Sequence, residues 1–239
     1  MPDRAALVTG GSSGIGFAIA RALAENGYGV TVSARRPEKL AEAVYELVDA
    51  GLDVQQVVAN MSEEDDIHAL ARAHRERYGR LDVLVNNAGI GIGGQIADAE
   101  TKKLDLQLDV NLRGVYLMTR EAIPMLREAG HEHGKALLLN MSSIAGKYGQ
   151  PWLAAYSATK AAVVGLSQAT QGELQEDGVQ VTAFCPGFVD TPMTDWNEAV
   201  PKERMIQPED IVEAVYFLLR TSPNCLVPEI MFARPGDRL

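Results

Sequence analysis

The sequence predicts an α/β protein in which helices cover both faces of a doubly wound, mostly parallel, seven-stranded sheet. Short apolar runs without polar alternation, such as 5–8, are typical of strands that are buried on both faces. Along the chain these runs alternate with segments of helical periodicity, which is the order expected of βαβ units. A length of 239 residues suffices for one large core, so we expect residues 1–239 to form a single domain.

The composition argues against several classes of partner. The formal net charge is -10 at pH 7, so we expect no general binding to nucleic acid or to an anionic membrane. No apolar run approaches the roughly 20 residues that span a bilayer, and residues 1–4 leave no room for a signal peptide before the first strand. The only two cysteines, Cys185 and Cys225, lack metal-type spacing, so we expect no metal site and a cytoplasmic location.

A glycine-rich turn follows the first predicted strand and precedes a helical run over 17–26. Taken alone, a glycine cluster more often marks only a turn. In this context it indicates a dinucleotide site, because glycines let the backbone approach a pyrophosphate and the helix amino terminus offers free N–H groups. The predicted contacts are Thr9, Gly10, Ser12, Ser13, Gly14, Ile15 and Gly16.

The spacing of these glycines resembles the TGxxxGxG motif of the short-chain dehydrogenase/reductase family. Further motifs of that family follow in the right order, and the resemblance covers nearly the whole chain, by motif as far as Thr191. It implies a Rossmann fold and an NADP-dependent oxidoreductase that moves a hydride between nicotinamide and a carbonyl or secondary alcohol of a small molecule. The residues that carry it are Gly10, Gly14, Gly16, Asn86–Gly89, Ser143, Tyr156, Lys160 and Pro186–Gly187.

Tyr156 and Lys160 are the predicted acid/base pair. Residues four apart share one helical face, and a nearby ammonium favours the phenolate, so Lys160 is expected to lower the phenol pKa from its reference value of about 10. Many solvated helices have this spacing, so the pair gains weight only from the other motifs. The resemblance implies that Tyr156 exchanges a proton with the substrate oxygen and that Lys160 also holds the nicotinamide ribose.

Two more catalytic residues come from the resemblance. The family serine stands 13 residues before the tyrosine, which gives Ser143, and its hydroxyl would orient the substrate carbonyl. Asn111 lies in a helical pattern over 104–128 that we expect Pro124 to interrupt. It either satisfies backbone groups there or holds a water that leads to Lys160. A serine hydrolase is not supported, because neither a GxSxG turn nor a histidine accompanies Ser143.

Arg35 and Arg36 follow the second predicted strand, where an NAD site would carry an acidic residue. A guanidinium can clamp a 2'-phosphate, so these residues favour NADP over NAD, the alternative being two arginines in a solvated loop. Asn60 replaces an acidic residue that many family members place near the adenine. The other cofactor contacts implied by the resemblance are Met61, Asn87, Ala88, Gly89, Pro186, Gly187, Val189 and Thr191.

Other segments have more modest interpretations. Ser62 is a predicted N-cap for a helix that ends near Tyr78, and His68 and His74 on that helix are interpreted as surface residues. Residues 192–205 have the composition of a mobile lid with an apolar inner face, or equally of an ordinary surface loop. The glycines at 91–94 either border a substrate cleft or are simply flexible. Candidates for an apolar pocket are Ile92, Ile144, Tyr148, Trp152, Phe188, Met193 and Trp196.

Several functional alternatives stay open. One is a 3-oxoacyl thioester reductase, although the tail at 228–235 resembles the branch of the family that acts on small hydroxy acids. Another is a dinucleotide-binding sensor or scaffold without turnover. The resemblance further implies a cofactor-binding part at about 1–135, a catalytic and substrate part at about 136–239, and a homodimer or homotetramer paired through the helices at 104–128 and 152–176.

Overall fold

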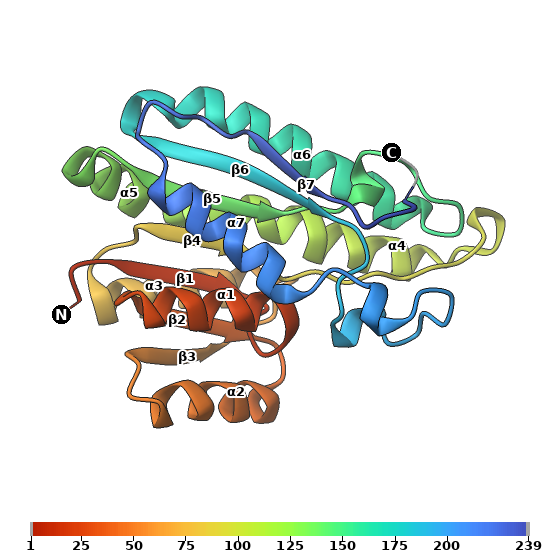
Figure 1. Ribbon diagram of the computed structural model, residues 1–239, viewed down its shortest axis with the longest axis horizontal. Coiled ribbons are helices and arrows are strands. Elements are labelled where there is room, and N and C mark those ends of the chain that lie inside the picture. The colour runs from red at the N-terminus through yellow and green to blue at the C-terminus, as the bar shows by residue number, and fades with distance from the viewer. Residues whose placement is uncertain (1, 238–239) are drawn as a thin grey trace.

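The computed structural model describes residues 2–237, and its strands form one sheet in the order β3-β2-β1-β4-β5-β6-β7 (Figure 1). Every neighbouring pair is parallel, so the predicted single-domain, doubly wound fold is confirmed and the described sheet is wholly parallel. The strands are β1 (Ala5–Thr9), β2 (Gly29–Ala34), β3 (Val54–Val58), β4 (Val83–Asn86), β5 (Ala136–Met141), β6 (Val179–Pro186) and β7 (Glu229–Phe232).

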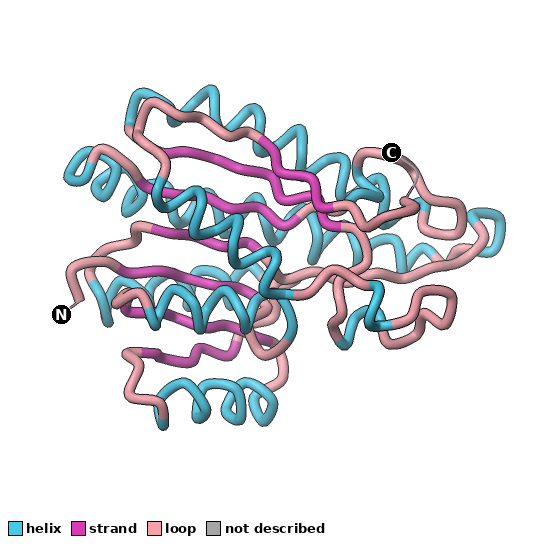
Figure 2. Tube along the Cα trace, viewed as in Figure 1, coloured by secondary structure: helices cyan, strands magenta, loops and turns pink. Residues whose placement is uncertain are grey.

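Helices cover both faces of this sheet (Figure 2). One face packs against α1, α2 and α7, and the other against α3, α5 and α6. Strand side chains alternate between faces, so Ala6 and Val8 enter one core while Leu7 enters the other. The helices are α1 (Gly14–Glu25), α2 (Pro37–Asp49), α3 (Glu64–Tyr78), α4 (Thr101–Leu108), α5 (Gly114–His133), α6 (Ala154–Leu174) and α7 (Pro208–Arg220). Short 3-10 turns are η1 (Ile96–Asp98), η3 (Ile144–Gly146), η4 (Gln175–Asp177), η5 (Pro192–Thr194) and η6 (Lys202–Arg204).

The long helical pattern around Asn111 differs from its prediction. α4 and α5 are joined by a π-helical turn, η2 (Asp109–Arg113), and α5 then continues past Pro124 as far as His133. The expected interruption at Pro124 is therefore wrong. Proline removes one helical hydrogen bond, but the buried side chains of α5 on either side of it hold the helix against the sheet.

The order of the strands reverses direction between β1 and β4. Ligands of open α/β sheets bind outside the carboxyl ends of the strands at such a point. The chain leaves β1 into the glycine turn and leaves β4 into the segment 87–94. The fold thus brings the two glycine-containing segments to one crevice.

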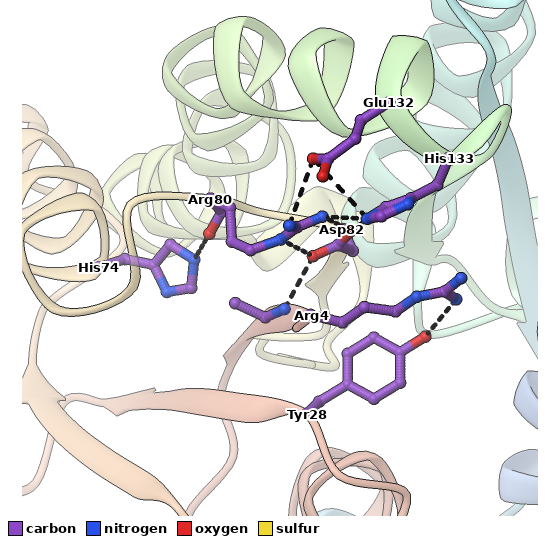
Figure 3. Close-up of polar contacts among 8 residues, drawn as sticks. Arg4, Tyr28, His74, Arg80, Asp82, Glu132 and His133 are labelled. Atoms are coloured by element: carbon purple, nitrogen blue, oxygen red, sulfur yellow. Dashed lines mark hydrogen bonds and ion pairs between the residues drawn. The ribbon is translucent and has the colours of Figure 1, made fainter. Parts of the chain in front are cut away.

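At the amino ends of the strands, opposite the crevice, a polar network surrounds Asp82 (Figure 3). This carboxylate, 3% exposed, accepts hydrogen bonds from the Ala5 N–H at 2.8 Å and from the Arg80 guanidinium at 2.8 and 2.7 Å. Arg80 also pairs with Glu132 at 3.3 Å and contacts His133 at the end of α5. The network therefore fastens the start of β1 and the end of α5 to the start of β4.

His74 is a buried residue, so its assignment to the surface is wrong, whereas the His68 side chain is 43% exposed, as expected of a surface residue. The Nε2 of His74 lies 2.9 Å from the Arg80 carbonyl, which can only accept, so Nε2 carries the proton. Nδ1 then accepts from the Thr31 hydroxyl at 2.7 Å, and that hydroxyl accepts from Gln55 Nε2 at 2.7 Å. Burial lowers the pKa of His74 to about 4, which keeps the imidazole neutral.

The predicted N-cap of α3 is displaced by one residue. The helix begins at Glu64 and its N-cap is Glu63, because the Ser62 N–H is directed to Asn60 Oδ1 at 3.3 Å and its hydroxyl to the Glu63 carboxylate at 3.1 Å. Glu64, Asp65 and Asp66 stand in the first turn, where they interact favourably with the helix dipole.

Candidate active site

The glycine turn between β1 and α1 forms a backbone cradle. Gly10 and Gly14 have φ angles of 66° and 56°, a left-handed conformation that favours glycine. A Cβ on Gly16 would stand 2.4 Å from Asn87 Nδ2 and 2.5 Å from the Gly10 carbonyl oxygen. Ser13 is the extended N-cap of α1, so the amino terminus of the helix faces this turn. A cradle that a side chain would fill fits a pyrophosphate that needs close backbone approach.

Asn87 and Thr9 hold the glycine turn against the end of β4. The Asn87 amide donates to the Thr9 and Gly10 carbonyl oxygens, both at 3.0 Å. In return the Thr9 hydroxyl accepts from the backbone N–H groups of Asn87 and Ala88, both at 3.1 Å. These bonds fix the two sides of the crevice relative to each other before any ligand binds.

Asn111 joins three segments around the site. Its Nδ2 donates to the Ile90 carbonyl and its Oδ1 accepts from the Ile90 N–H, both at 2.8 Å. Nδ2 also donates to the Thr159 hydroxyl of α6 at 3.1 Å. The structural role predicted for the amide is therefore present. A Cβ on Gly89 would lie 3.2 Å from Lys160 Nζ and 3.3 Å from Asn111 Oδ1, so a side chain there would crowd both groups.

Tyr156 lies beside Ser143, on the first turns of α6. Burial raises the pKa of the Tyr156 phenol, while hydrogen bonding with the Ser143 hydroxyl lowers it by less. Lys160 Nζ is 5.7 Å from the centroid of the Tyr156 ring. The prediction that Lys160 lowers the phenol pKa is therefore wrong. Desolvation, which raises the pKa, outweighs the hydrogen bond with Ser143, which lowers it. The phenol is held in its protonated form.

Lys160 is buried, with 3% of its surface exposed, and donates to the Met141 carbonyl at the end of β5 at 2.8 Å. Burial lowers the pKa of this lysine to about 8. The Ser142 hydroxyl donates to the Lys160 carbonyl at 2.8 Å, so α6 is fastened to the end of β5 at Lys160 itself. Ser142 and Thr159 were missed as positioning residues. The only signal was a small polar residue next to each predicted catalytic residue.

The Pro186–Gly187 segment closes the site from the end of β6. The Ser143 hydroxyl lies 3.3 Å from the Pro186 carbonyl oxygen, and the Gly187 N–H donates to the Phe232 carbonyl of β7 at 2.9 Å. A Cβ on Gly14 would lie 2.9 Å from the Thr191 methyl group, so Thr191 packs directly on the glycine turn. The structure thus brings together the predicted residues of β1, β5, α6 and β6.

The residues predicted to meet the adenosine end follow β2 and β3. Arg35 and Arg36 are exposed, and their side chains make no ion pair with any residue between 2 and 237. Asn60 is partly buried, and Met61 is 7% exposed within the hydrophobic core. The Met61 side chain therefore packs in the core and is not free to meet a ligand.

Comparisons with known proteins agree with this geometry. The family model described as short chain dehydrogenase matches residues 4–201. The chain belongs to the short-chain dehydrogenase family. Among curated relatives, the 3-oxoacyl-[acyl-carrier-protein] reductase FabG of Staphylococcus aureus is 38% identical over 244 residues, covering 98% of this chain and 97% of the relative. A granaticin polyketide synthase putative ketoacyl reductase from Streptomyces violaceoruber is 43% identical over 191 residues, covering 80% of this chain and 69% of the relative.

Solved structures of the family superpose closely on the chain. An alcohol dehydrogenase from Thermococcus sibiricus, complexed with 5-hydroxy-NADP, has a TM-score of 0.88 at 31% identity and covers 99% of this chain and 98% of its own. A 3-ketoacyl-(acyl-carrier-protein) reductase from Brucella melitensis, complexed with NADH, has a TM-score of 0.87 at 32% identity, with 96% of each chain covered. Family membership confirms the predicted Rossmann fold and oxidoreductase class.

Two glycines of the segment 87–94 lie next to aromatic rings. A Cβ on Gly91 would lie 3.7 Å from the Tyr156 ring, and one on Gly93 would lie 2.1 Å from the Trp152 ring. Within residues 2–237, no helix is long and apolar enough to cross a membrane. No group of three or more His, Cys, Asp or Glu side chains in that range is arranged to hold a metal ion.

Proposed function

We propose that this protein is an NADP(H)-dependent reductase of carbonyl compounds, acting through Ser143, Tyr156 and Lys160. The observation that carries the proposal is the convergence of these side chains beside a glycine turn that is shaped for a dinucleotide. A sensor or scaffold needs the turn but has no use for a protonated phenol next to a serine hydroxyl. Family membership supports the same reaction class.

The residues present fit a nicotinamide dinucleotide. The turn from Thr9 to Gly16, with Ser12, Ser13 and Ile15, would hold the pyrophosphate. Lys160 would hold the nicotinamide ribose, and Val189 and Thr191 would meet the carboxamide. When bound, the nicotinamide supplies the hydride to the carbonyl carbon or accepts it in the reverse direction.

The protein's own side chains bind and protonate the carbonyl oxygen of the substrate. Ser143 donates a hydrogen bond to the carbonyl oxygen, and that bond strengthens as negative charge develops. Tyr156, whose pKa is raised by burial, carries the proton that the nascent alkoxide needs. Lys160, with a pKa of about 8, can exchange a proton near neutral pH, and Asn111 would hold a water that links it to solvent.

The preference for NADP rests on Arg35 and Arg36. Both are exposed at the carboxyl end of β2, and neither is neutralised by a carboxylate among residues 2–237. A guanidinium in that place attracts a 2'-phosphate, with Arg35 as the main contact. One structural relative is complexed with an NADP derivative and another with NADH, so the family accommodates either cofactor.

The test is NADPH oxidation over a panel of ketones, aldehydes, keto acids and acyl thioesters. We expect turnover with at least one carbonyl class and a loss of about 100-fold or more in Tyr156→Phe, because proton transfer by a positioned side chain contributes about 10²–10⁴-fold. Turnover of Tyr156→Phe at the wild-type rate contradicts the mechanism. Tight NADPH binding without oxidation on any carbonyl favours the sensor.

A 3-oxoacyl thioester is the second candidate substrate. The FabG reductase of Staphylococcus aureus matches nearly the full length of the chain, which favours this substrate over the small hydroxy acids suggested by the tail. Parallel assays with an acetoacetyl thioester and with a keto acid of the same carbon number distinguish the two. Higher kcat/KM on the thioester supports the second candidate.

We further propose a cytoplasmic homodimer or homotetramer, with a cofactor-binding part at 1–135 and a catalytic part at 136–239. Exposed apolar side chains on α4 and α5 support assembly through these helices: Leu104, Leu106, Leu108 and Tyr116 are 36–55% exposed. Light scattering on the purified protein measures the assembly, and a monomeric mass at micromolar concentration contradicts it.

A further inference from the structure

The segment after β7 forms a turn that its own sequence encodes. The run Arg234-Pro235-Gly236-Asp237 places proline and glycine at the two central positions of a type II turn. The Arg234 carbonyl accepts from the Asp237 N–H at 3.1 Å, and Gly236 has a φ of 94°, as the second central position requires. The turn lies beyond the carboxyl ends of the strands, on the same side as the catalytic groups (Figure 1).

An ion pair with little exposure to solvent closes this turn. The Asp237 carboxylate accepts from the Arg234 guanidinium at 2.8 Å and from the Arg234 N–H at 3.0 Å. The two side chains are only 17% and 14% exposed, so solvent screens the pair less than it screens a surface pair. The Arg234 Nε is buried without a hydrogen-bond partner among residues 2–237, which leaves the guanidinium dependent on Asp237.

The ion pair rests on the backbone that leaves β6 for the active site. One Asp237 carboxylate oxygen would stand 3.1 Å from a Cβ on Gly187, so it lies directly over that glycine. The Gly187 N–H donates to the Phe232 carbonyl of β7 at 2.9 Å. The Arg234 guanidinium lies 6.0 Å from the centroid of the Phe188 ring, within reach of a cation–π contact. The turn therefore holds two consecutive residues of the segment from the β7 side.

The same backbone serves both reactants of the proposed function. Gly187 follows Pro186, whose carbonyl oxygen lies 3.3 Å from the Ser143 hydroxyl. It precedes Val189 and Thr191, which would meet the nicotinamide carboxamide. A displacement of this backbone would therefore move the substrate-binding hydroxyl and the carboxamide contacts together. Misplacement of reacting groups by about 1 Å can reduce a rate about 100-fold.

We propose that Arg234 and Asp237 are positioning residues, whose ion pair fixes the Pro186–Gly187 backbone where nicotinamide and substrate meet. The inference rests on the proposed function. Both side chains act through the backbone beneath them rather than on the reacting atoms. Breaking the pair should leave the adenosine end of the dinucleotide site intact, because the glycine turn and Arg35 follow β1 and β2.

Binding measurements test this role without turnover. We expect NADPH to bind wild type more tightly than 2'-phospho-ADP-ribose, which is the same molecule without the nicotinamide. In calorimetry, Asp237→Ala and Arg234→Met should reduce that affinity ratio by about two- to tenfold, the contribution of one hydrogen bond, without changing the affinity for 2'-phospho-ADP-ribose. Equal affinities in wild type, an unchanged ratio in both variants, or equal losses for both ligands overturn the proposal.

Further variants separate the ion pair from the stability of the fold. Arg234→Lys keeps a cation and should restore most of the ratio that Arg234→Met loses. Gly236→Ala has no neighbour within 4 Å of its Cβ, but its φ of 94° disfavours alanine, so it should lower the ratio with both charges present. The matched control is Arg77→Met, which breaks an exposed 2.8 Å pair with Asp53 before β3 and should keep the wild-type ratio. A loss in the control as large as that in Arg234→Met contradicts the positioning role.

Kinetics give a second readout, and the two proposals fail separately. For any carbonyl that wild type reduces, kcat should fall about 10- to 100-fold in Asp237→Ala, while KM for NADPH rises by no more than about tenfold. If wild type reduces no carbonyl but the affinity ratio falls in Asp237→Ala, the reductase function is wrong and the positioning role stands. If carbonyls are reduced and Asp237→Ala changes neither the ratio nor kcat, the positioning role is wrong and the function stands.

Discussion

Acidification should destabilise this protein through His74. The imidazole is buried and neutral, with a pKa of about 4 in the fold against 6.5 when free. In the hydrogen-bond chain, Nε2 donates to the Arg80 carbonyl and Nδ1 accepts from Thr31, so protonation of Nδ1 would place a proton against the one that Thr31 donates. If the Thr31 hydroxyl accepted that proton as well as the one from Gln55, its own O–H would lose the acceptor that it now has in Nδ1.

The sign and size follow from linkage. Below pH 6.5 the unfolded chain binds a proton at His74, whereas the folded chain does not bind it until about pH 4. The free energy of unfolding therefore decreases as pH falls through this window. The loss from His74 is about 2 kcal/mol at pH 5 and about 3 kcal/mol near pH 4, where it levels off. Above pH 7 the group contributes no pH dependence.

The assay is urea unfolding at pH 7.5 and pH 5.0 for wild type, His74→Gln and His68→Gln. His74→Gln lowers stability at both pH values, but its difference between them should be smaller than that of wild type by about 2 kcal/mol. His68→Gln removes a histidine of the same helix whose side chain is 43% exposed, and should keep the wild-type difference to within about 0.5 kcal/mol. Equal differences in wild type and His74→Gln would refute the reasoning.

Three further predictions concern the site. Arg35→Glu should weaken NADPH binding by about 10- to 100-fold, the worth of a charge-assisted hydrogen bond, and leave NADH binding within about threefold; equal losses for both cofactors, measured by fluorescence titration, contradict the phosphate role. Gly16→Ala should abolish measurable NADPH binding, because its Cβ would stand 2.4 Å from Asn87 Nδ2, and calorimetry that finds wild-type affinity refutes this. Carbonyl reduction should decline as pH rises through about 8, where Lys160 loses the charge that holds the ribose; a profile that stays flat from pH 7 to 9 contradicts it.

The fold and the glycine turn could be predicted from local sequence patterns. The features that differ from the predictions depend on contacts between residues far apart in the sequence. The spacing of Gly10 and Gly14 encodes a backbone conformation, so it was sufficient to place the turn. His74 was misassigned from its chemistry, although its position continues the buried stripe of Ile67 and Leu70 on α3. That periodicity was the available signal. An imidazole on an apolar stripe can be buried when both of its ring nitrogens find hydrogen-bond partners.

The site also shows what residue spacing cannot give. Tyr156 and Lys160 are four apart in any helix, but the direction of their pKa shifts depends on how deeply the helix is buried. The π-helical turn at Asn111 has no local sequence signal either. It is stabilised by hydrogen bonds from Asn111 to Ile90 and to Thr159, partners 21 and 48 positions away.

The network around Asp82 has a consequence for evolution of the enzyme. It lies at the amino end of β4, whereas the groups that meet ligands lie beyond the carboxyl ends of the strands. Chemistry and anchorage therefore occupy opposite ends of one sheet. Substitutions beyond the carboxyl ends of the strands therefore leave the contacts of Asp82 intact. Substitutions that strengthen the contacts of Asp82 or Arg80 can raise the stability of the fold. A more stable fold tolerates destabilising substitutions at the other end of the sheet, including those that alter substrate choice.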